Sequence, residues 1–208
     1  MSPASVKLPL SFDPLRLAAD AARFIGGEWQ PHFNIHYYQG DWSVIPLRAV
    51  KDGKSEIFPD IEAPHGYINT PLMDRCRYVP ELLKSFECEL QTVRFLKLSA
   101  GSIIRRHRDY ELGLEDGFVR IHVPAATNKE VDFVLDGVSV PMLPGEAWYL
   151  NVNRYHSVTN GGKTDRIHLV IDCVVNDWMR SMLSLGGPPD QMDIDAVVSA
   201  GFETQVDK

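Results

Sequence analysis

A short run in the middle of the chain places a histidine and an aspartate two residues apart. In His107-Arg108-Asp109 this spacing would point both side chains to the same face of a β-strand. A second histidine, His156, lies 47 positions after the aspartate (156 − 109), and Arg166 follows 10 positions later (166 − 156). Imidazole nitrogens and carboxylate oxygens are metal ligands, and a guanidinium group binds a carboxylate through paired hydrogen bonds. These residue types therefore predict a metal site with an anion-binding group beside it.

Two histidines and one carboxylate are the ligand set that holds Fe(II) in non-heme oxygenases and leaves other coordination positions open. An oxo-acid cosubstrate and O2 would bind at the open positions, and Arg166 would hold the far carboxylate of the cosubstrate. The ligand set therefore predicts a type of reaction, iron-dependent oxygenation, and leaves the substrate unnamed.

Each of these residues also has a common structural explanation. Most His-X-Asp triplets are surface turns or hydrogen-bonded pairs, His156 could be an ordinary loop histidine, and Arg166 could be a surface charge on an edge strand. The order of the residues favours the metal site. The triplet is followed by a β-rich run with an arginine and a histidine, then by the distal histidine and then by the second arginine.

The part of the chain that carries these residues has the pattern of a β-sandwich or barrel. Short β-rich runs alternate with turn sequences, and Asp136-Gly137 and Pro144-Gly145 mark two of the turns. The runs are 92–99, 118–124, 130–135, 138–142, 147–151 and 166–175. Many short strands at regular spacing predict a sandwich, jelly roll or barrel.

Two of these runs carry charged and apolar residues on opposite faces. Arg120 and His122 share one face of the second run, and Arg166 and His168 share one face of the last, while the alternate residues are mostly apolar. This pattern predicts strands that pack one face against an apolar layer and turn the other toward a polar interior. His122 could instead be a hydrogen-bonded core histidine, and the role of His168 stays open between the core and the site.

The flanking segments are less regular. Asp13 as an N-cap and Pro14 at the first helical position predict a helix that ends before Gly26-Gly27. The other predicted elements are a strand at 43–50, helical stretches at 71–86 and 178–185, and a second short C-terminal helix at 193–200. The aromatic segment 29–42 could wall a substrate pocket and 110–117 could form a lid beside the metal. For most of the aromatic residues, packing of the N-terminal helices against the sheet is the favoured explanation.

Composition narrows the class of protein. The chain has 208 residues, 44% of them hydrophobic, and carries a net charge of −7, which argues against a general nucleic-acid surface. No apolar run is long enough to cross a membrane, and the N-terminus lacks the apolar core of a signal peptide. Cys76, Cys88 and Cys173 follow no metal-ligand spacing, so we expect reduced thiols in a cytoplasmic protein. The oligomeric state is left open.

Taken together, these segments resemble the aspartyl/asparaginyl β-hydroxylase family of 2-oxoglutarate- and Fe(II)-dependent dioxygenases. The resemblance runs from about residue 95 to residue 172, under half of the chain. The matching segments are 101–109, 120–124, 145–149, 156–158 and 166–172. It implies a mainly β fold with flanking helices, the double-stranded β-helix or cupin-type jelly roll. One dioxygenase domain would span 1–208, with an N-terminal elaboration at 1–90, the jelly-roll core at 91–175 and a C-terminal tail at 176–208.

The resemblance also implies roles for particular residues. The iron ligands would be His107, Asp109 and His156. Arg166 would bind the distal carboxylate of 2-oxoglutarate. His122 would lie near the metal-bound carboxylate end of the cosubstrate, and Arg120 would face the cosubstrate or a substrate carboxylate. The implied activity is hydroxylation of an unactivated C–H bond in an amino acid or in an amino-acid residue of a peptide, with release of succinate and CO2. The substrate would be a small molecule or a peptide that carries a carboxylate.

The chain departs from parts of the family pattern. Vertebrate peptidyl aspartyl hydroxylases of the family lack the carboxylate ligand, whereas this chain has Asp109. In this respect it is similar to bacterial hydroxylases of free amino acids, including proline hydroxylases, which retain the His-X-Asp triplet. The carboxylate also argues for hydroxylation over halogenation. A serine that helps to hold 2-oxoglutarate in the vertebrate enzymes falls near Leu96, so cosubstrate binding must differ in detail. The alternatives are a metal cupin of another class and a non-enzymatic cupin module that binds a small carboxylate.

Overall fold

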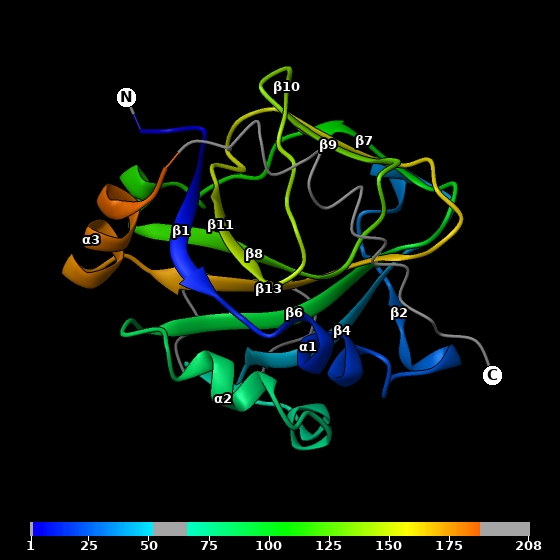
Figure 1. Ribbon diagram of the computed structural model, residues 1–208, viewed down its shortest axis with the longest axis horizontal. Helices are drawn as coiled ribbons and strands as arrows, with labels where there is room; N and C mark the ends of the chain where they lie inside the picture. The colour runs from blue at the N-terminus through cyan, green and yellow to red at the C-terminus, as the bar shows by residue number, and fades with distance from the viewer. Residues whose placement is uncertain (1, 52–65, 188–208) are drawn as a thin grey trace.

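Two antiparallel β-sheets form the frame of the molecule (Figure 1). The computed structural model describes residues 2–51 and 66–187. The larger sheet has the strand order β1 (Ser5–Ser11), β11 (Glu146–Leu150), β8 (Phe118–Ala126), β13 (Arg166–Val174), β6 (Leu90–Leu98), β4 (Trp42–Val50) and β2 (Gln30–Pro31), with β5 (Tyr67–Asn69) paired to β4. The smaller sheet has the order β10 (Val138–Ser139), β9 (Val131–Leu135), β12 (His156–Asn160), β7 (Ile103–His107) and β3 (Tyr38–Gln39).

The helices cover the side of the larger sheet that faces away from the smaller one. In Figure 1, α1 (Pro14–Ala21) and α2 (Val79–Leu83) lie below the larger sheet, while β7, β9 and β10 lie above it. The third helix is α3 (Asp177–Leu185), and short 3-10 turns are η1 (Gly26–Glu28), η2 (Ile35–Tyr37), η3 (Pro71–Arg75) and η4 (Leu114–Asp116). The predicted mainly β jelly roll with flanking helices is confirmed.

Residue alternation on the strands of the larger sheet separates two apolar clusters. One face packs against the helices through residues such as Phe95, Ile121 and Ile171. The other face contributes Leu96 and Val170 to a second cluster shared with the smaller sheet. The polar stripes predicted for the second and last β-rich runs lie on this second face, between the sheets.

Several predicted boundaries are wrong. The first helix ends at Ala21, with Ala22 as its C-cap, although Asp13 caps it as predicted by accepting two backbone N–H groups. The predicted helix at 71–86 is the 3-10 turn η3 followed by the short helix α2. Pro80 lies in the first turn of α2, where its missing N–H costs no helical hydrogen bond.

Some strands were not predicted, whereas the two predicted turns, at Asp136-Gly137 and Pro144-Gly145, are present. Strand β1 joins the larger sheet beside β11, and the short strand β12 carries His156 in the smaller sheet, so the sheets draw on strands outside the runs with obvious alternation. The hairpin at Asp136-Gly137 is confirmed. Both residues have positive φ (52° and 79°), as the tight turn between β9 and β10 requires.

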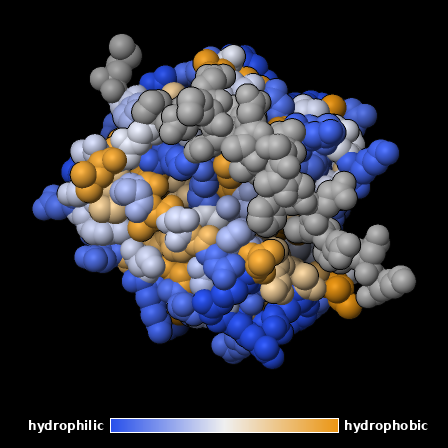
Figure 2. Space-filling model, viewed as in Figure 1, coloured by the Kyte–Doolittle hydropathy of each residue, from blue (hydrophilic) through white to orange (hydrophobic). Residues whose placement is uncertain are grey.

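Polar and apolar side chains are interspersed over the visible face, with apolar side chains gathered over α3 (Figure 2). Leu185 of this helix is among the exposed apolar residues. The three cysteines are free thiols, as expected. Among the helices of the described ranges, none combines the length and apolarity that a membrane span requires. The helix predicted at 193–200 lies outside the described residues.

Candidate functional site

A cavity of about 360 Å³ opens between the two sheets. Six residues singled out from the sequence lie on its wall: His107, Asp109, Arg120, His122, His156 and Arg166. They come from strands β7, β8, β12 and β13 and from the segment just after β7. Residues distant in the sequence therefore meet at one place because both sheets turn their polar stripes toward it.

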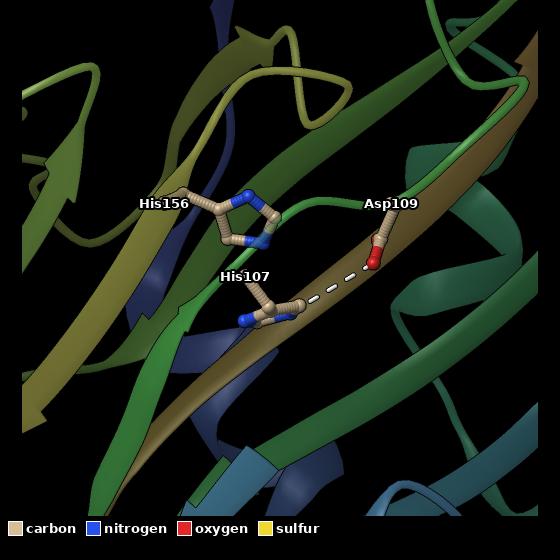
Figure 3. Close-up of side chains that lie close together, drawn as sticks. All are labelled: His107, Asp109 and His156. Carbon is tan, nitrogen blue, oxygen red and sulfur yellow. Dashed lines mark ion pairs between the residues drawn. The ribbon is translucent and has the colours of Figure 1, made fainter.

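Two neighbouring strands of the smaller sheet hold the histidines of the predicted metal site. His107 ends β7 and pairs with His156 at the start of β12. Asp109 lies two residues beyond β7, not on the strand, and its backbone N–H donates to the carbonyl oxygen of Val152 over 2.9 Å. One potential ligand atom from each of the three side chains lies within 4.8 Å of the other two, and the side chains converge on one point (Figure 3).

Backbone carbonyls fix which nitrogen of each imidazole is free. His107 Nδ1 lies 2.8 Å from the carbonyl oxygen of Arg105, and His156 Nδ1 lies 3.0 Å from that of Arg154. A carbonyl only accepts hydrogen bonds, so each Nδ1 must carry the proton, which leaves an Nε2 lone pair available. Burial lowers the pKa of His156 to about 4, so this ring is neutral at pH 7. Two imidazole lone pairs and one carboxylate fit Fe(II).

Aromatic rings restrict how the two imidazoles can turn. Tyr37 stacks on His107, with ring centroids 5.1 Å apart and an angle of 21° between the planes. Phe133 lies parallel to His156 at 5.9 Å. Both ligand rings are therefore held in place by packing as well as by their hydrogen bonds.

The carboxylate of the triad is tied to a buried ionic cluster. Arg120 donates from Nη1 to Asp109 Oδ2 over 2.5 Å, and from Nε and Nη2 to Asp172 over 2.7 and 3.1 Å. Burial alone would raise the pKa of Asp109, but the charge of Arg120 holds it below its ordinary value. The pKa of Arg120 rises because its two carboxylate partners outweigh its burial. Asp109 therefore stays ionised, as a metal ligand must.

Three residues of this cluster, Asp172, Arg94 and Thr92, were not identified from the sequence. Arg94 donates to Asp172 over 2.9 Å and also lies on the cavity wall, and Thr92 donates its hydroxyl to the same carboxylate over 2.5 Å. Arg94 and Thr92 both lie on β6. An arginine in the middle of a β-rich run is the signal that identified Arg120, and it would have found Arg94 as well.

Arg166 differs from the other buried arginines because no carboxylate in residues 2–51 and 66–187 pairs with it. It is 2% exposed, its Nε has no hydrogen-bond partner within those ranges, and burial lowers its pKa to about 9. Its Nη2 donates to His168 Nδ1 over 2.9 Å. A buried guanidinium without a counter-ion is costly, so this end of the cavity favours a bound anion.

His122 and His168 form a histidine pair beside Arg166. Their Nδ1 atoms lie 3.3 Å apart, and burial, followed by the charge of Arg166, holds both pKa values well below the ordinary value. His122 lies on the cavity wall, and its Nε2 is buried without a partner among the described residues. His168 lies behind that wall. The sequence had left its role open, and in the structure it contacts the arginine and does not line the cavity.

The aromatic segment 29–42 contributes directly to the cavity. His32, Phe33, Asn34, Tyr37 and Trp42 line it, and so do Tyr110 and Leu112 from the predicted lid 110–117. The rings of His32 and Trp42 stack at 3.5 Å, and burial lowers the pKa of His32 to about 3. Packing against the sheet had been favoured for most of these aromatics. This part of the cavity wall, which includes Tyr37 stacked on His107, is therefore largely neutral and aromatic.

Comparison with known proteins agrees with the geometry. The family model for aspartyl/asparaginyl beta-hydroxylase matches residues 16–175. The chain is 30% identical over 178 residues to the L-proline cis-4-hydroxylase of Rhizobium meliloti (strain 1021), across 84% of this chain and 62% of that protein, so it spans less than two thirds of that relative.

Among solved structures, the fold is similar to that of the non-heme alpha ketoglutarate dependent epimerase SnoN from nogalamycin biosynthesis. The TM-score is 0.51 at 12% identity, over 90% of this chain and 88% of that chain. A 2OG-Fe(II) oxygenase family oxidoreductase from Burkholderia pseudomallei matches with a TM-score of 0.49 and 16% identity, over 82% of this chain and 84% of that one. The family match extends through both sheets and every residue of the triad, and the chain belongs to the aspartyl/asparaginyl beta-hydroxylase family.

Proposed function

We propose that the chain is an Fe(II)- and 2-oxoglutarate-dependent dioxygenase that hydroxylates an unactivated C–H bond, with release of succinate and CO2. One observation carries the proposal. The His107, Asp109 and His156 ligand set and the carboxylate-free guanidinium of Arg166 face the same cavity. A metal and a dianionic cosubstrate would meet both requirements at once. Family membership and the 30% identity to a proline hydroxylase support the same activity.

Five residues of the cavity have definite tasks in this proposal. His107, Asp109 and His156 would hold Fe(II), and Arg166 would bind the far carboxylate of 2-oxoglutarate bidentately. His122 would lie near the metal-bound end of the cosubstrate. Fe(II) with bound 2-oxoglutarate supplies the activation of O2 for attack on a C–H bond. The chain orients the reactants and keeps water away from them, since the cavity lies between two packed sheets.

The substrate of this proposal is a free amino acid or a similar small carboxylate. The guanidinium of Arg120 has five N–H donors, of which Asp172 and Asp109 take three. Arg94 lies beside it, and its Nε has no hydrogen-bond partner among the described residues. A substrate carboxylate can therefore bind here while Asp172 keeps its place. A cavity of about 360 Å³ suits small molecules better than a folded peptide segment, and L-proline is the first candidate because a relative acts on it.

The other proposed features follow from the sequence alone. We expect one dioxygenase domain over residues 1–208 and a cytoplasmic location, the latter from the pattern of free cysteines. A peptide that presents an aspartyl or asparaginyl residue stays the second substrate class, because the family takes its name from that reaction.

Two competing functions fit the cavity less well. A metal cupin that uses no oxo-acid has no need of a buried arginine without a counter-ion, and such sites recruit more histidines than the two found here. A non-enzymatic module that binds a small carboxylate would need Arg166 but not the three converging ligand atoms.

Succinate formation tests the proposal directly. The protein is incubated with Fe(II), ascorbate, O2 and 2-oxoglutarate, together with a panel of free amino acids that begins with L-proline and short peptides containing Asp or Asn. We expect one panel member to stimulate succinate release and His107→Ala to abolish it. Absence of turnover, together with absence of an Fe(II)–2-oxoglutarate absorption band under anaerobic conditions, would contradict the proposal.

A second assay tests the substrate carboxylate. Arg120→Ala should raise the KM of the substrate, whereas Arg106→Ala, which alters an exposed arginine on β7, should not. Unchanged KM values for both substrate and 2-oxoglutarate in Arg120→Ala would rule out its proposed role.

A further inference from the structure

Asp172 is the most heavily hydrogen-bonded carboxylate near the cavity, yet it is no part of the metal triad. It is 1% exposed and accepts from Thr92 Oγ1, Arg94 Nη2 and both Nε and Nη2 of Arg120. Burial alone would raise its pKa, but the two arginines hold it below its ordinary value. Asp172 is therefore a fixed negative charge at the base of the cluster.

Strand pairing aims Arg120 from this fixed point toward the metal triad. Asp172 on β13 is the direct partner of Arg120 on β8 in the sheet register. With Nε and Nη2 held by Asp172, the remaining nitrogen, Nη1, reaches Asp109 Oδ2 over 2.5 Å. Because the guanidinium is planar, the position of the Asp172 carboxylate determines where Nη1 meets the Asp109 carboxylate.

Asp109 needs such support because it lies beyond the end of β7. Its side chain is 28% exposed, and within the described ranges its carboxylate forms ion pairs only with Arg120 and, at 3.8 Å, with His107 Nε2. Arg120 occupies Oδ2, so Oδ1 is the oxygen left facing His107. Arg120 thus selects which carboxylate oxygen joins the two histidines.

We propose that Asp172 is a positioning residue for the metal centre, which acts through Arg120 to orient Asp109 and to increase the affinity of the site for a divalent metal. The inference rests on the proposed function, because it takes the triad as a metal site. It also gives a reason for the charge of Asp172. With Asp172 ionised, Arg120 is already compensated; without that charge, Asp109 would be its only carboxylate partner, and Arg120 would compete with the metal for it.

A purely structural role makes a different prediction. Asp172 also balances the charges of Arg94 and Arg120, so its removal should destabilise the protein whatever its effect on metal. A control variant must therefore lose a buried carboxylate elsewhere. Asp20 provides one, since it is 2% exposed and accepts from the backbone N–H groups of residues 77–79.

The test is a titration of the metal-free full chain with Co(II) in the absence of 2-oxoglutarate. Binding is monitored through the visible absorption of the bound ion. Asp172→Asn should raise the Kd for Co(II) by about 10–100-fold, the range seen when support of a metal ligand is removed. Asp20→Asn should lower the midpoint of thermal unfolding and leave the Kd for Co(II) within twofold of wild type.

A milder variant guards against failure of Asp172→Asn to fold. Thr92→Val removes one hydrogen bond to Asp172 and leaves both arginines, so it should raise the Kd for Co(II) by a smaller factor, above twofold, in a stable protein. Unchanged Co(II) affinity in Asp172→Asn, or in Thr92→Val if the former does not fold, would overturn the inference while the metal site stands. A wild-type protein that binds no Co(II) would overturn the metal site and this inference together.

Discussion

Buried charges are balanced at one end of the cavity and unbalanced at the other. At one end, the arginines 94 and 120 share the carboxylates of Asp109 and Asp172, so two positive charges meet two negative ones. At the other end, Arg166 donates to the neutral His168, and no carboxylate of the described residues pairs with it. The three arginines and Asp172 are buried, while the side chain of Asp109 is 28% exposed.

The difference separates a cluster with balanced charges from a buried charge that lacks a counter-ion. A buried ionic cluster whose charges all have partners is complete in the ligand-free protein and can hold other groups in fixed positions. A buried guanidinium without a counter-ion is incomplete until an anion arrives. The cavity therefore combines a finished scaffold beside the metal ligands with an unfinished site where the cosubstrate would bind.

Removal of Asp172 should produce the largest change in stability. Asp172→Ala leaves two buried arginines with one carboxylate, and loss of one partner from a buried ion pair costs about 3–5 kcal/mol of unfolding free energy. Urea denaturation of the metal-free protein measures this loss. A loss below about 1 kcal/mol, the range of exposed ion pairs, would show that the cluster is not the scaffold described here.

Arg166→Met should have the reverse pattern. It removes a buried charge that has no counter-ion, so the unfolding free energy of the ligand-free protein should stay the same or rise. Affinity for 2-oxoglutarate should fall about 100-fold, because about 3 kcal/mol of charge-assisted hydrogen bonding is lost. Calorimetry with the Fe(II)-loaded or Co(II)-loaded protein measures the second effect. Arg166→Lys keeps a charge but not the paired geometry, so its affinity for 2-oxoglutarate should lie between those of wild type and Arg166→Met. Destabilisation as large as that of Asp172→Ala would remove the contrast between the two ends.

On acidification, the two ends of the cavity should lose their contributions to stability at different pH values. The folded-state pKa values of His122 and His168 lie well below 6.5, so below that pH the unfolded chain binds protons that the folded chain does not. Stability from these rings is complete above pH 6.5 and is lost as the pH falls below it. The pKa of Asp172 is also lowered, but from 3.8, so stability from the carboxylate end persists until the pH falls below that value.

A single substitution can test the first of these windows. His168→Gln keeps an acceptor for Arg166 but removes a titrating group. Between pH 6.5 and 5, the dependence of unfolding free energy on pH should become shallower by at most one proton, which is about 1.4 kcal/mol per pH unit. Urea denaturation of the metal-free protein at several pH values gives this slope. An unchanged slope would show that His168 does not titrate on unfolding in that range.

The alternation of β8 and β13 was enough to predict the polar interior. Arg120 and Arg166 alternate with apolar residues, and both point between the sheets. Asp172 and Arg94 show the same alternation, so their inward orientation could also have been predicted. Their pairing with each other could not. It depends on β13 lying between β8 and β6 in a particular register, which is set by contacts far apart in the sequence.

The positions of two of the proposed metal ligands illustrate the other limit. Asp109 was expected on a strand with His107, but β7 ends at His107 and a hydrogen bond to Val152 sets the path of the next residues. His156 begins a five-residue strand, His156–Asn160, whose polar composition resembles a loop. The residue types were sufficient to propose the ligands, whereas tertiary pairing decides where the backbone places them.

Substitution of an exposed arginine beside the cavity should have the smallest effect. It serves as a control for Asp172→Ala and Arg166→Met. Arg106 is exposed on β7 and lies over the ring of Tyr155, 3.8 Å from its centroid. Arg106→Met should change the unfolding free energy by less than about 1 kcal/mol, because a cation–π contact in water is weak. It should leave 2-oxoglutarate affinity unchanged, since the side chain is not on the cavity wall. If Arg106→Met lowered 2-oxoglutarate affinity as much as Arg166→Met, the effects of Arg166 on affinity could not be attributed to a buried guanidinium without a counter-ion. They would then reflect the general loss of positive charge near the cavity.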